Sequence, residues 1–205
     1  MTAGIDVAWP QGRYDWQQQA GRISFGMCKA TEDTGLIDPY FEDNWNGMWS
    51  LDRTMPRFAY HFFRAASEPA AQAAHFVSAV KARGLLPGDN LVADFESTDD
   101  DGLNDGVPPW QFAPRAVAFL REVNTLAPDH RVLPYSNPSF AGAGNCAGMG
   151  SWFWWVADYG VSAPKMAGPW STWTFWQCND VPGGTDLFNG TDAELRAFCR
   201  MPASR

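Results

Sequence analysis

Charged residues and histidine are scarce in this chain of 205 residues, and the charge that is present is mostly negative. Asp, Glu, Lys and Arg together make up 19% of the sequence, there are three His, and the formal net charge is −8 at pH 7. Proteins bind nucleic acids largely because their basic side chains displace counterions from the phosphates. This chain has few basic residues, so the sequence argues against a nucleic-acid partner. The same negative charge disfavours binding to an anionic membrane surface.

Cysteine is also rare, and its spacing argues against the usual metal frameworks. Cys28, Cys146, Cys178 and Cys199 form no CxxC pair, and no His lies at ligand spacing from them. We therefore expect no zinc site, no other metal and no cofactor. We expect reduced thiols because nothing in the sequence indicates secretion, whereas oxidised thiols would allow three disulfide connectivities.

Long apolar runs are absent. No segment approaches the roughly 20 consecutive apolar residues that a transmembrane helix needs. Residues 1–4 lead directly into a strand-like run, without the basic region, apolar stretch and cleavage site of a signal peptide. The sequence therefore predicts a protein made in the cytoplasm without a signal peptide, although a protein exported by another route would look the same.

Apolar and aromatic residues are abundant instead. Hydrophobic residues make up 45% of the chain, and eleven residues are Trp. A chain of this length and composition is globular and can bury one sizeable core, so a single domain is expected. The excess of Trp indicates either an unusually aromatic core or a groove lined with flat rings that stack on sugars or bases.

Strand-like and helix-like segments alternate over the first two-thirds of the chain. The expected strands are residues 5–9, 23–30, 58–62, 91–96 and 131–135, and the expected helices are residues 39–51, 69–83 and 109–126. After residue 135 no further helix is expected, and strands are predicted at 152–159, 173–178 and 185–188. Alternating strands and helices favour a parallel sheet, and about eight strands favour a closed TIM-like α/β barrel with an irregular last third.

Two carboxylates lie two residues apart in the expected strand 91–96. Because side chains alternate along a strand, Asp94 and Glu96 face the same side, with backbone positions roughly 6.6 Å apart. Like-charge repulsion and burial among apolar neighbours raise the pKa of at least one of them. A carboxylic acid that stays protonated near neutral pH is a proton donor, so the pair predicts general acid catalysis.

Other polar side chains are expected at the same edge of the barrel. Asp6 lies within the first expected strand and Asp186 begins the last, and these two strands are neighbours in a closed barrel. The alternative is that Asp6 caps a turn and Asp186 belongs to a loop. The side chains expected around the carboxylates are Tyr60, His61, Tyr135, Trp155, Asp158, Tyr159 and Gln177. For His61 a role as a satisfied core histidine is an equal alternative.

The acidic run at residues 99–106 allows two interpretations. Its Asp, Asn and Gly residues suggest a calcium loop, but it lacks the regular alternation and terminal Glu of a helix-loop-helix calcium site. A solvated loop is the preferred interpretation.

Short blocks along nearly the whole chain occur in the order found in a known enzyme family. The blocks are Gly4-Ile5-Asp6-Val7 with Gln11-Gly12, Lys29-Ala30-Thr31-Glu32 with Asp38-Pro39, Ala59-Tyr60-His61-Phe62-Phe63, Gln72-Ala73 with Phe76, Asp94-Phe95-Glu96, Trp155-Val156-Ala157-Asp158-Tyr159, Trp176-Gln177 and Asp186-Leu187-Phe188-Asn189-Gly190. Each block is weak alone, but the ordered set resembles glycoside hydrolase family 25, lysozymes of the N-acetylmuramidase type found among phage endolysins and bacterial autolysins. Ala8, Asp33 and Cys178 depart from the family pattern, and none of these departures removes a carboxylate.

The resemblance implies a fold and a reaction. The fold is an irregular (β/α)5β3 barrel, with residues 1–205 as a single catalytic domain and no separate cell-wall-binding module. The reaction is hydrolysis of the β-1,4 bond between N-acetylmuramic acid and N-acetylglucosamine in peptidoglycan. Glu96 is implied as the general acid and Asp94 as the group that stabilises the intermediate formed by the substrate's own acetamido group, with Asp6 and Asp186 in support. Whether the reaction inverts or retains the anomeric configuration stays open.

Two alternatives belong to other functional classes. One is a non-catalytic glycan-binding barrel, which would not need the Asp94/Glu96 pair. The other is a chitinase-like glycosidase, although Leu91 and Val92 occupy the place of the longer acidic motif of those enzymes. The resemblance further implies a monomer that acts at the bacterial cell wall, as an endolysin released at lysis or as an exported autolysin, with peptidoglycan glycan strands as its partner.

Overall fold

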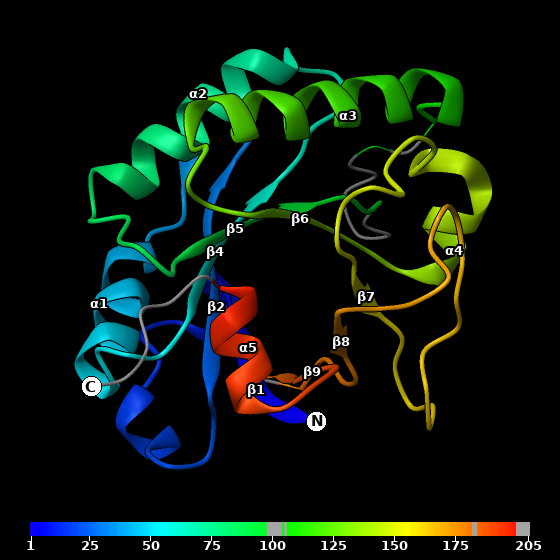
Figure 1. The fold of residues 1–205 in the computed structure, drawn as a ribbon. Helices are drawn as coiled ribbons and strands as arrows, with labels where there is room; N and C mark the ends of the chain where they lie inside the picture. The colour runs from blue at the N-terminus through cyan, green and yellow to red at the C-terminus, as the bar shows by residue number, and fades with distance from the viewer. Residues whose placement is uncertain (98–103, 105, 182–183, 200–205) are drawn as a thin grey trace.

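The computed structural model describes residues 1–97, 104, 106–181 and 184–199, and its centre is a closed barrel (Figure 1). The barrel strands are β1 (Thr2–Val7), β2 (Phe25–Glu32), β4 (Arg57–Phe62), β5 (Asn90–Asp94), β6 (Val132–Ser136), β7 (Trp155–Ala157), β8 (Phe175–Gln177) and β9 (Gly184–Phe188). They are neighbours in chain order, and β9 pairs with β1 to complete the circle. The short β3 (Leu36–Ile37) pairs with the end of β2 outside the circle.

Strand direction in the barrel determines where polar side chains gather. Neighbouring strands from β1 to β8 are parallel, whereas β9 is antiparallel to both β8 and β1. The predicted α/β barrel with an irregular last third is therefore confirmed. Because the parallel strands end at one rim, residues at their carboxyl ends meet there although they are far apart in sequence.

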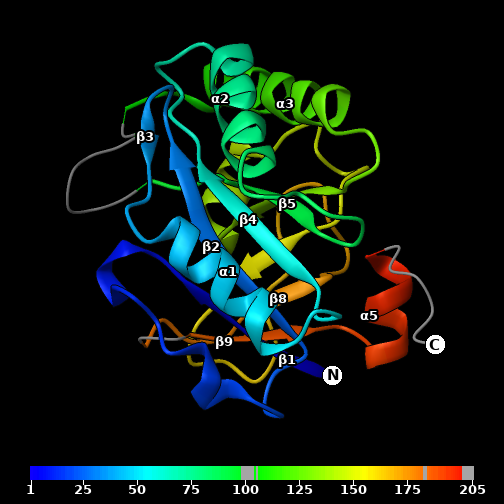
Figure 2. The same ribbon diagram turned by 90° about the vertical axis from the view of Figure 1, so that its left-hand side faces the viewer.

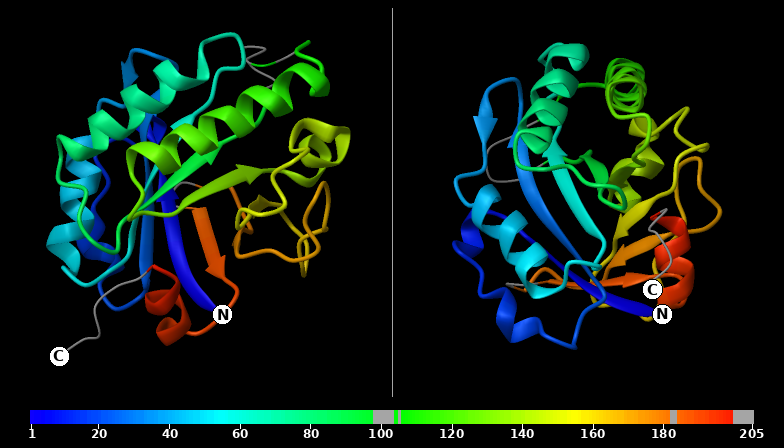
Figure 3. Two further views of the ribbon diagram at one scale, coloured as in Figure 1. Left: turned by 45° about the horizontal axis from the view of Figure 1, so that its top comes forward. Right: turned by 60° about the vertical axis from the view of Figure 1, so that its left-hand side comes forward.

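Three helices cover the outer face of the barrel. α1 (Phe41–Leu51) contacts β2 and β4, while α2 (Pro69–Lys81) and α3 (Pro109–Leu126) lie side by side farther round it (Figures 2 and 3). The helices predicted at 39–51, 69–83 and 109–126 are thus confirmed to within two residues at either end. Pro opens both α2 and α3, where its missing N–H costs no helical hydrogen bond.

Side chains alternate between two apolar layers. On β5, Leu91 and Ala93 face the outer layer under the helices, and Val92 faces the barrel interior. The interior is filled by aromatic rings, with the centroid of Phe175 lying 5.2 Å from that of Phe25 and 5.1 Å from that of Phe58. Most of the aromatic excess is therefore core. Trp9 and Trp110 are the exposed Trp side chains of the described ranges.

Two helices are present where the sequence predicts none. The single turn α4 (Pro138–Phe140) follows β6, and α5 (Asp192–Phe198) follows β9 and lies at the end of the barrel where β1 begins (Figures 1 and 3). The prediction that helices cease after β6 is therefore wrong. At the start of α5, the Thr191 hydroxyl accepts a hydrogen bond from the Glu194 N–H, and the Glu194 carboxylate accepts one from the Thr191 N–H. This capping box was readable in the sequence and fixes the start of the helix.

The expected strand 91–96 is shorter in the structure. β5 ends at Asp94, so Glu96 lies two residues beyond the last paired strand residue. The main chain nevertheless continues in the same direction, because the Phe95 N–H donates to the Tyr135 carbonyl over 2.9 Å. Phe95 remains in the outer layer. The predicted separation of Phe95 from the acidic side is therefore confirmed.

Gly4 lies where a larger residue would collide with the inner core. A Cβ atom at this position would lie 2.3 Å from Cε2 of the Phe25 ring, which itself contacts other rings of the barrel interior. We expect Gly4→Ala to lower the free energy of unfolding by about 1–3 kcal/mol, because the ring has no free space to enter. Urea denaturation would measure the loss. Gly35→Ala is the matched control, since a Cβ atom added there would have no neighbour within 4 Å; equal losses in the two variants would contradict the argument.

Membrane spans, cysteines and the acidic run were also subjects of prediction. No helix in the described ranges is long and apolar enough to cross a membrane. The four cysteines are free thiols, and Cys178 is the one that is partly accessible. The acidic run at 99–106 lies largely outside the described residues, which include only 104 and 106 from it.

Candidate active site

Carboxyl groups from three strands converge inside the barrel at the rim where the parallel strands end. Asp6 alternates with Ile5 and Val7, which face the outer layer, so its side chain is directed inward. Asp94 follows the inward-facing Val92 by two residues, and Asp186 lies on the inner side of β9 and is fully buried. The predicted convergence of Asp6, Asp94 and Asp186 is therefore observed, and neither Asp6 nor Asp186 lies in a turn or loop.

Asp6 and Asp186 are neighbouring carboxyls of the paired strands β1 and β9. Burial is the main cause that raises the pKa of both, and the proximity of Asp6 raises the pKa of Asp186 further. Oδ1 of Asp186 accepts a hydrogen bond from Trp155 Nε1 at 2.9 Å, whereas buried Oδ2 has no conventional donor among the described residues. Burial and the proximity of a second carboxyl both favour the protonated form of such a group.

Asp94 and Glu96 form the second carboxyl pair. Burial raises the pKa of Asp94 well above its ordinary value, and the neighbouring charge of Glu96 adds to the shift. Burial likewise raises the pKa of Glu96 to about 7, with Lys29 opposing the shift and Asp6 adding to it. The sequence pattern predicted a raised pKa for at least one of the two, and the environment raises the pKa of both. Like-charge repulsion between them disfavours the state in which both are ionised.

These raised pKa values predict how stability changes with pH. A carboxyl whose pKa is raised by folding contributes stability below its unfolded pKa, and this contribution is lost as the pH rises through the folded value. For Glu96 that window extends from 4.5 to about 7. We expect the Tm to fall more steeply across this window in the unmodified protein than in Glu96→Gln, a difference of about 2–3 kcal/mol in unfolding free energy. Calorimetry at a series of pH values would test this; parallel Tm curves for the two proteins would refute it.

Gln177 connects Asp6 to the tyrosines of the rim. Its Nε2 donates to Asp6 Oδ1 at 2.7 Å, and its Oε1 accepts from the hydroxyls of Tyr135 at 2.8 Å and Tyr159 at 2.7 Å. These bonds orient the amide group without ambiguity, since Oε1 receives two donors. The centroid of the Trp155 ring lies 4.5 Å from that of the Tyr135 ring. The predicted site residues of β6, β7 and β8 are therefore brought together.

A cleft of about 520 Å³ opens beside Glu96. Its wall includes Tyr135, Tyr159 and Asp158, and Asp158 Oδ2 accepts a hydrogen bond from the backbone N–H of Lys165. Two of the predicted substrate-binding residues, Tyr60 and Trp155, do not line this cleft, because both are buried in the barrel interior with ring centroids 6.3 Å apart. An open cleft with flat aromatic walls beside a buried carboxyl pair suits an extended polymeric sugar.

His61 lies outside the candidate active site. It is fully buried on the outer side of β4, where its ring stacks on Phe119 with centroids 4.9 Å apart. Its Nδ1 lies 2.8 Å from the Thr31 hydroxyl and its Nε2 lies 3.2 Å from Gln72 Oε1. Burial lowers the pKa of His61 to about 3, which keeps the ring neutral. The predicted substrate-binding role is corrected here to that of a core histidine, because alternation on β4 directs it away from the barrel interior.

Three charged residues of the site were not singled out from the sequence. Lys29 on β2 is buried and faces the carboxyls, and it forms an ion pair with Glu32, which also binds Arg64. Lys29 interrupts the apolar run of its strand just as Asp6 interrupts its own, and this was the available signal. Asn104 also contributes, because its Nδ2 donates to the main-chain carbonyl of Glu96 at 2.9 Å and so fixes the chain past β5.

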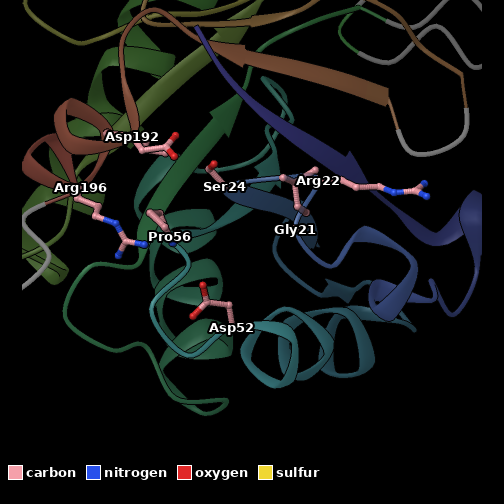
Figure 4. A pocket seen from close by; sticks show the side chains of 9 residues that line it. Gly21, Arg22, Ser24, Asp52, Pro56, Asp192 and Arg196 are labelled. Atoms are coloured by element: carbon pink, nitrogen blue, oxygen red, sulfur yellow. The ribbon is translucent and has the colours of Figure 1, made fainter. Parts of the chain in front are cut away.

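A second cavity, of about 280 Å³, lies at the opposite end of the barrel (Figure 4). It is bordered by Ser24 and Pro56, which precede β2 and β4, and by Asp192 and Arg196 of α5. Arg196 donates to the Thr54 carbonyl, and both Asp52 and Asp192 are exposed. Its charged groups are therefore solvated or paired, in contrast to the buried carboxyls at the other end.

Comparison with known proteins agrees with this geometry. The family model of glycosyl hydrolases family 25 matches residues 5–183, a range that includes Asp6, Asp94 and Glu96. The chain belongs to this family. Lysozyme M1 of Streptomyces globisporus is 32% identical over 218 residues, covering 98% of this chain and 72% of that protein.

Solved structures of family 25 enzymes have the same fold. The lysozyme of Streptomyces coelicolor is 31% identical and superposes with a TM-score of 0.83, covering 97% of this chain and 96% of that one. The family 25 lysozyme of Aspergillus fumigatus is 25% identical, also with a TM-score of 0.83, over 97% of this chain and 98% of that one. The protein is thus a glycoside hydrolase of the lysozyme type, with a family 25 barrel.

Proposed function

We propose that the protein hydrolyses the β-1,4 bond between N-acetylmuramic acid and N-acetylglucosamine in peptidoglycan. The observation that carries this proposal is the Asp94/Glu96 pair, in which Asp94 is buried and Glu96 borders a cleft that Tyr135 and Tyr159 also line. Such a pair supplies both a proton for the leaving oxygen and a negative charge for the oxocarbenium-like transition state. The lysozyme and muramidase names of the structural neighbours support the choice of substrate.

Glu96 is the general acid in this proposal. It borders the cleft, whereas Asp94 lies deeper and is 6% exposed, so Glu96 is the carboxyl that a glycosidic oxygen can reach. A pKa of about 7 keeps a large fraction of Glu96 protonated at neutral pH and still allows the proton to be given up. The hydrogen bond from Asn104 to its main chain holds this acid at the cleft edge.

Asp94 stabilises the intermediate. Its Oδ1 is buried and has no hydrogen-bond donor within the described residues, so it is free to accept the N–H of the substrate's acetamido group. When the acetamido oxygen attacks the anomeric carbon, positive charge develops on this N–H, and an adjacent carboxylate lowers the energy of that charge. Asp6 and Asp186 hold Gln177 and Trp155 in place around the sugar.

Aromatic side chains form the walls that hold the glycan. Tyr135 and Tyr159 line the cleft, where Tyr159 is 44% exposed at the rim, and buried Trp155 packs against Tyr135. Pyranose rings stack on such surfaces through their apolar C–H faces. We further propose that the protein acts as a monomer at the bacterial cell wall, outside any membrane and without nucleic acid.

Product analysis tests the proposal. Purified peptidoglycan would be digested, the new reducing ends reduced with borohydride, and the fragments identified by mass spectrometry. Reduced muramic acid at the new ends is the expected result, whereas reduced glucosamine would overturn the bond assignment. Faster cleavage of chitin oligomers would favour a chitinase-like enzyme, and binding without turnover would favour a glycan-binding barrel. Proton NMR of the first-formed anomer should show retention, as an acetamido-assisted reaction requires.

A further inference from the structure

Two basic side chains lie beside the carboxyls of the site, and one glutamate binds both. Lys29 Nζ is 2.7 Å from Glu32 Oε2, and Arg64 Nε is 2.9 Å from Glu32 Oε1. Each oxygen of Glu32 therefore has its own cation. The three side chains together carry a net charge of +1, because two positive groups share one negative group.

Lys29 is the member of this group that faces the site. Cys28 and Ala30 on either side of it belong to the outer layer, and Met27 belongs to the inner core, so Lys29 is directed into the barrel. It is 9% exposed, and its Nζ lies 5.1 Å from the centroid of the Phe62 ring. Burial of such a charge is costly unless it is paired, and Glu32 is its partner.

Charged and titratable groups from every neighbouring element face the Asp94/Glu96 pair. They are Asp6 on β1, Lys29 and Glu32 on β2, Tyr60 on β4, Tyr135 on β6, and Tyr159 and Lys165 after β7; behind them, Asp38 before α1 lies near Tyr60 and Asp186 on β9 lies near Asp6. Carboxyls dominate this set. The charge of Lys29 lowers the pKa of both Asp94 and Glu96, against the burial that raises them.

We propose that Lys29, held in place by Glu32 and Arg64, is a positioning residue that keeps one carboxyl of the Asp94/Glu96 pair charged while the other acts as the acid. The inference rests on the proposed function, in which one carboxyl must donate a proton while the other is charged. Without a buried cation, burial penalises both negative charges, and the pair would become fully protonated near neutral pH. It would then contain an acid but no anion for the intermediate.

Two substitutions test this role, one that removes a positive charge and one that removes a negative charge. Lys29→Met removes a positive charge and should move the bell-shaped pH profile of kcat/KM to higher pH by about one unit. Glu32→Gln removes a negative charge and should move both limbs to lower pH. A loss of structure alone would lower activity in both variants without opposite displacements. The double variant should have a profile between those of the two single variants.

Controls separate this inference from the proposed function. Lys81→Met is the matched control, because Lys81 donates to the Leu126 carbonyl on the exposed surface away from the site, and its pH profile should be unchanged. An unshifted profile in Lys29→Met, or shifts of the same sign in both variants, would overturn the role of Lys29. If Lys29→Met fails to fold, Glu32→Gln alone carries the test. Carbon-13 NMR titration of the Asp and Glu carboxyls should show the same displacements without relying on activity. That result would stand even if product analysis refuted the muramidase assignment.

Discussion

Replacing Glu96 with Gln is expected to lower the rate of peptidoglycan hydrolysis by about 10²- to 10⁴-fold. The amide has nearly the same shape as the acid but cannot give a proton to the leaving oxygen. Since the side chain borders the cleft and its main chain is held by Asn104, the variant should keep its fold and its affinity for the glycan. Release of reducing ends from purified cell walls would measure the rate, and sedimentation with those walls would measure binding.

A matched substitution shows whether the loss is specific. Glu68 is 79% exposed in its side chain and forms a surface pair with Arg115, so Glu68→Gln should hydrolyse peptidoglycan at the unmodified rate. Activity of Glu96→Gln within a few-fold of this control would show that another group supplies the proton. In that case Asp94, whose pKa is also raised by burial, would be the next candidate.

Replacing Asp89 with Ala is expected to lower the free energy of unfolding by about 3–5 kcal/mol. Asp89 and Arg57 form a two-point ion pair, with Nε 2.9 Å from Oδ1 and Nη2 2.6 Å from Oδ2, and both side chains are almost fully buried. The guanidinium also lies 3.9 Å from the centroid of the Trp45 ring and donates to the Trp45 carbonyl. Removal of the carboxylate leaves a charge that neither water nor another acid can reach.

Chemical denaturation of this variant is best compared with an exposed pair. Asp43 binds Arg13 at the surface, where the Arg side chain is 76% exposed, and Asp43→Ala should cost at most about 1 kcal/mol. A loss in Asp89→Ala no larger than in Asp43→Ala would show that water reaches Arg57. The additional replacement of Arg57 by Met in Asp89→Ala should recover part of the stability, since the unpaired charge is then gone.

Local sequence patterns predicted the elements of the barrel well where periodicity was strong. The helices at α2 and α3 and the strand at β4 were found with their approximate bounds, because an opening Pro and a clear apolar pattern specify them. α5 was missed because its pattern is short, although its Thr191/Glu194 capping box was present. β5 was predicted too long, since the apolar run continues through Phe95 while strand pairing does not.

The sequence predicted only part of the site. The Asp94/Glu96 spacing and the inward carboxyls at Asp6 and Asp186 follow from alternation and from barrel topology. His61 shows the limit of that reasoning, because alternation says which residues share a side but not which side faces the interior. Lys29 was overlooked because its role depends on Glu32 and Arg64, which only barrel closure brings beside the carboxyls.

The sequence by itself determined the order of the barrel strands and of helices α1 to α3, the family, and the identity of the acidic residues, because these depend on residue type and short-range spacing. The tertiary structure alone decided which carboxyls have raised pKa values, which cation lies beside them, and that His61 belongs to the core. The physical reason is that pKa values and ion pairs depend on burial and on distances between residues far apart in the chain. Those distances exist only once β9 pairs with β1 and the barrel is closed.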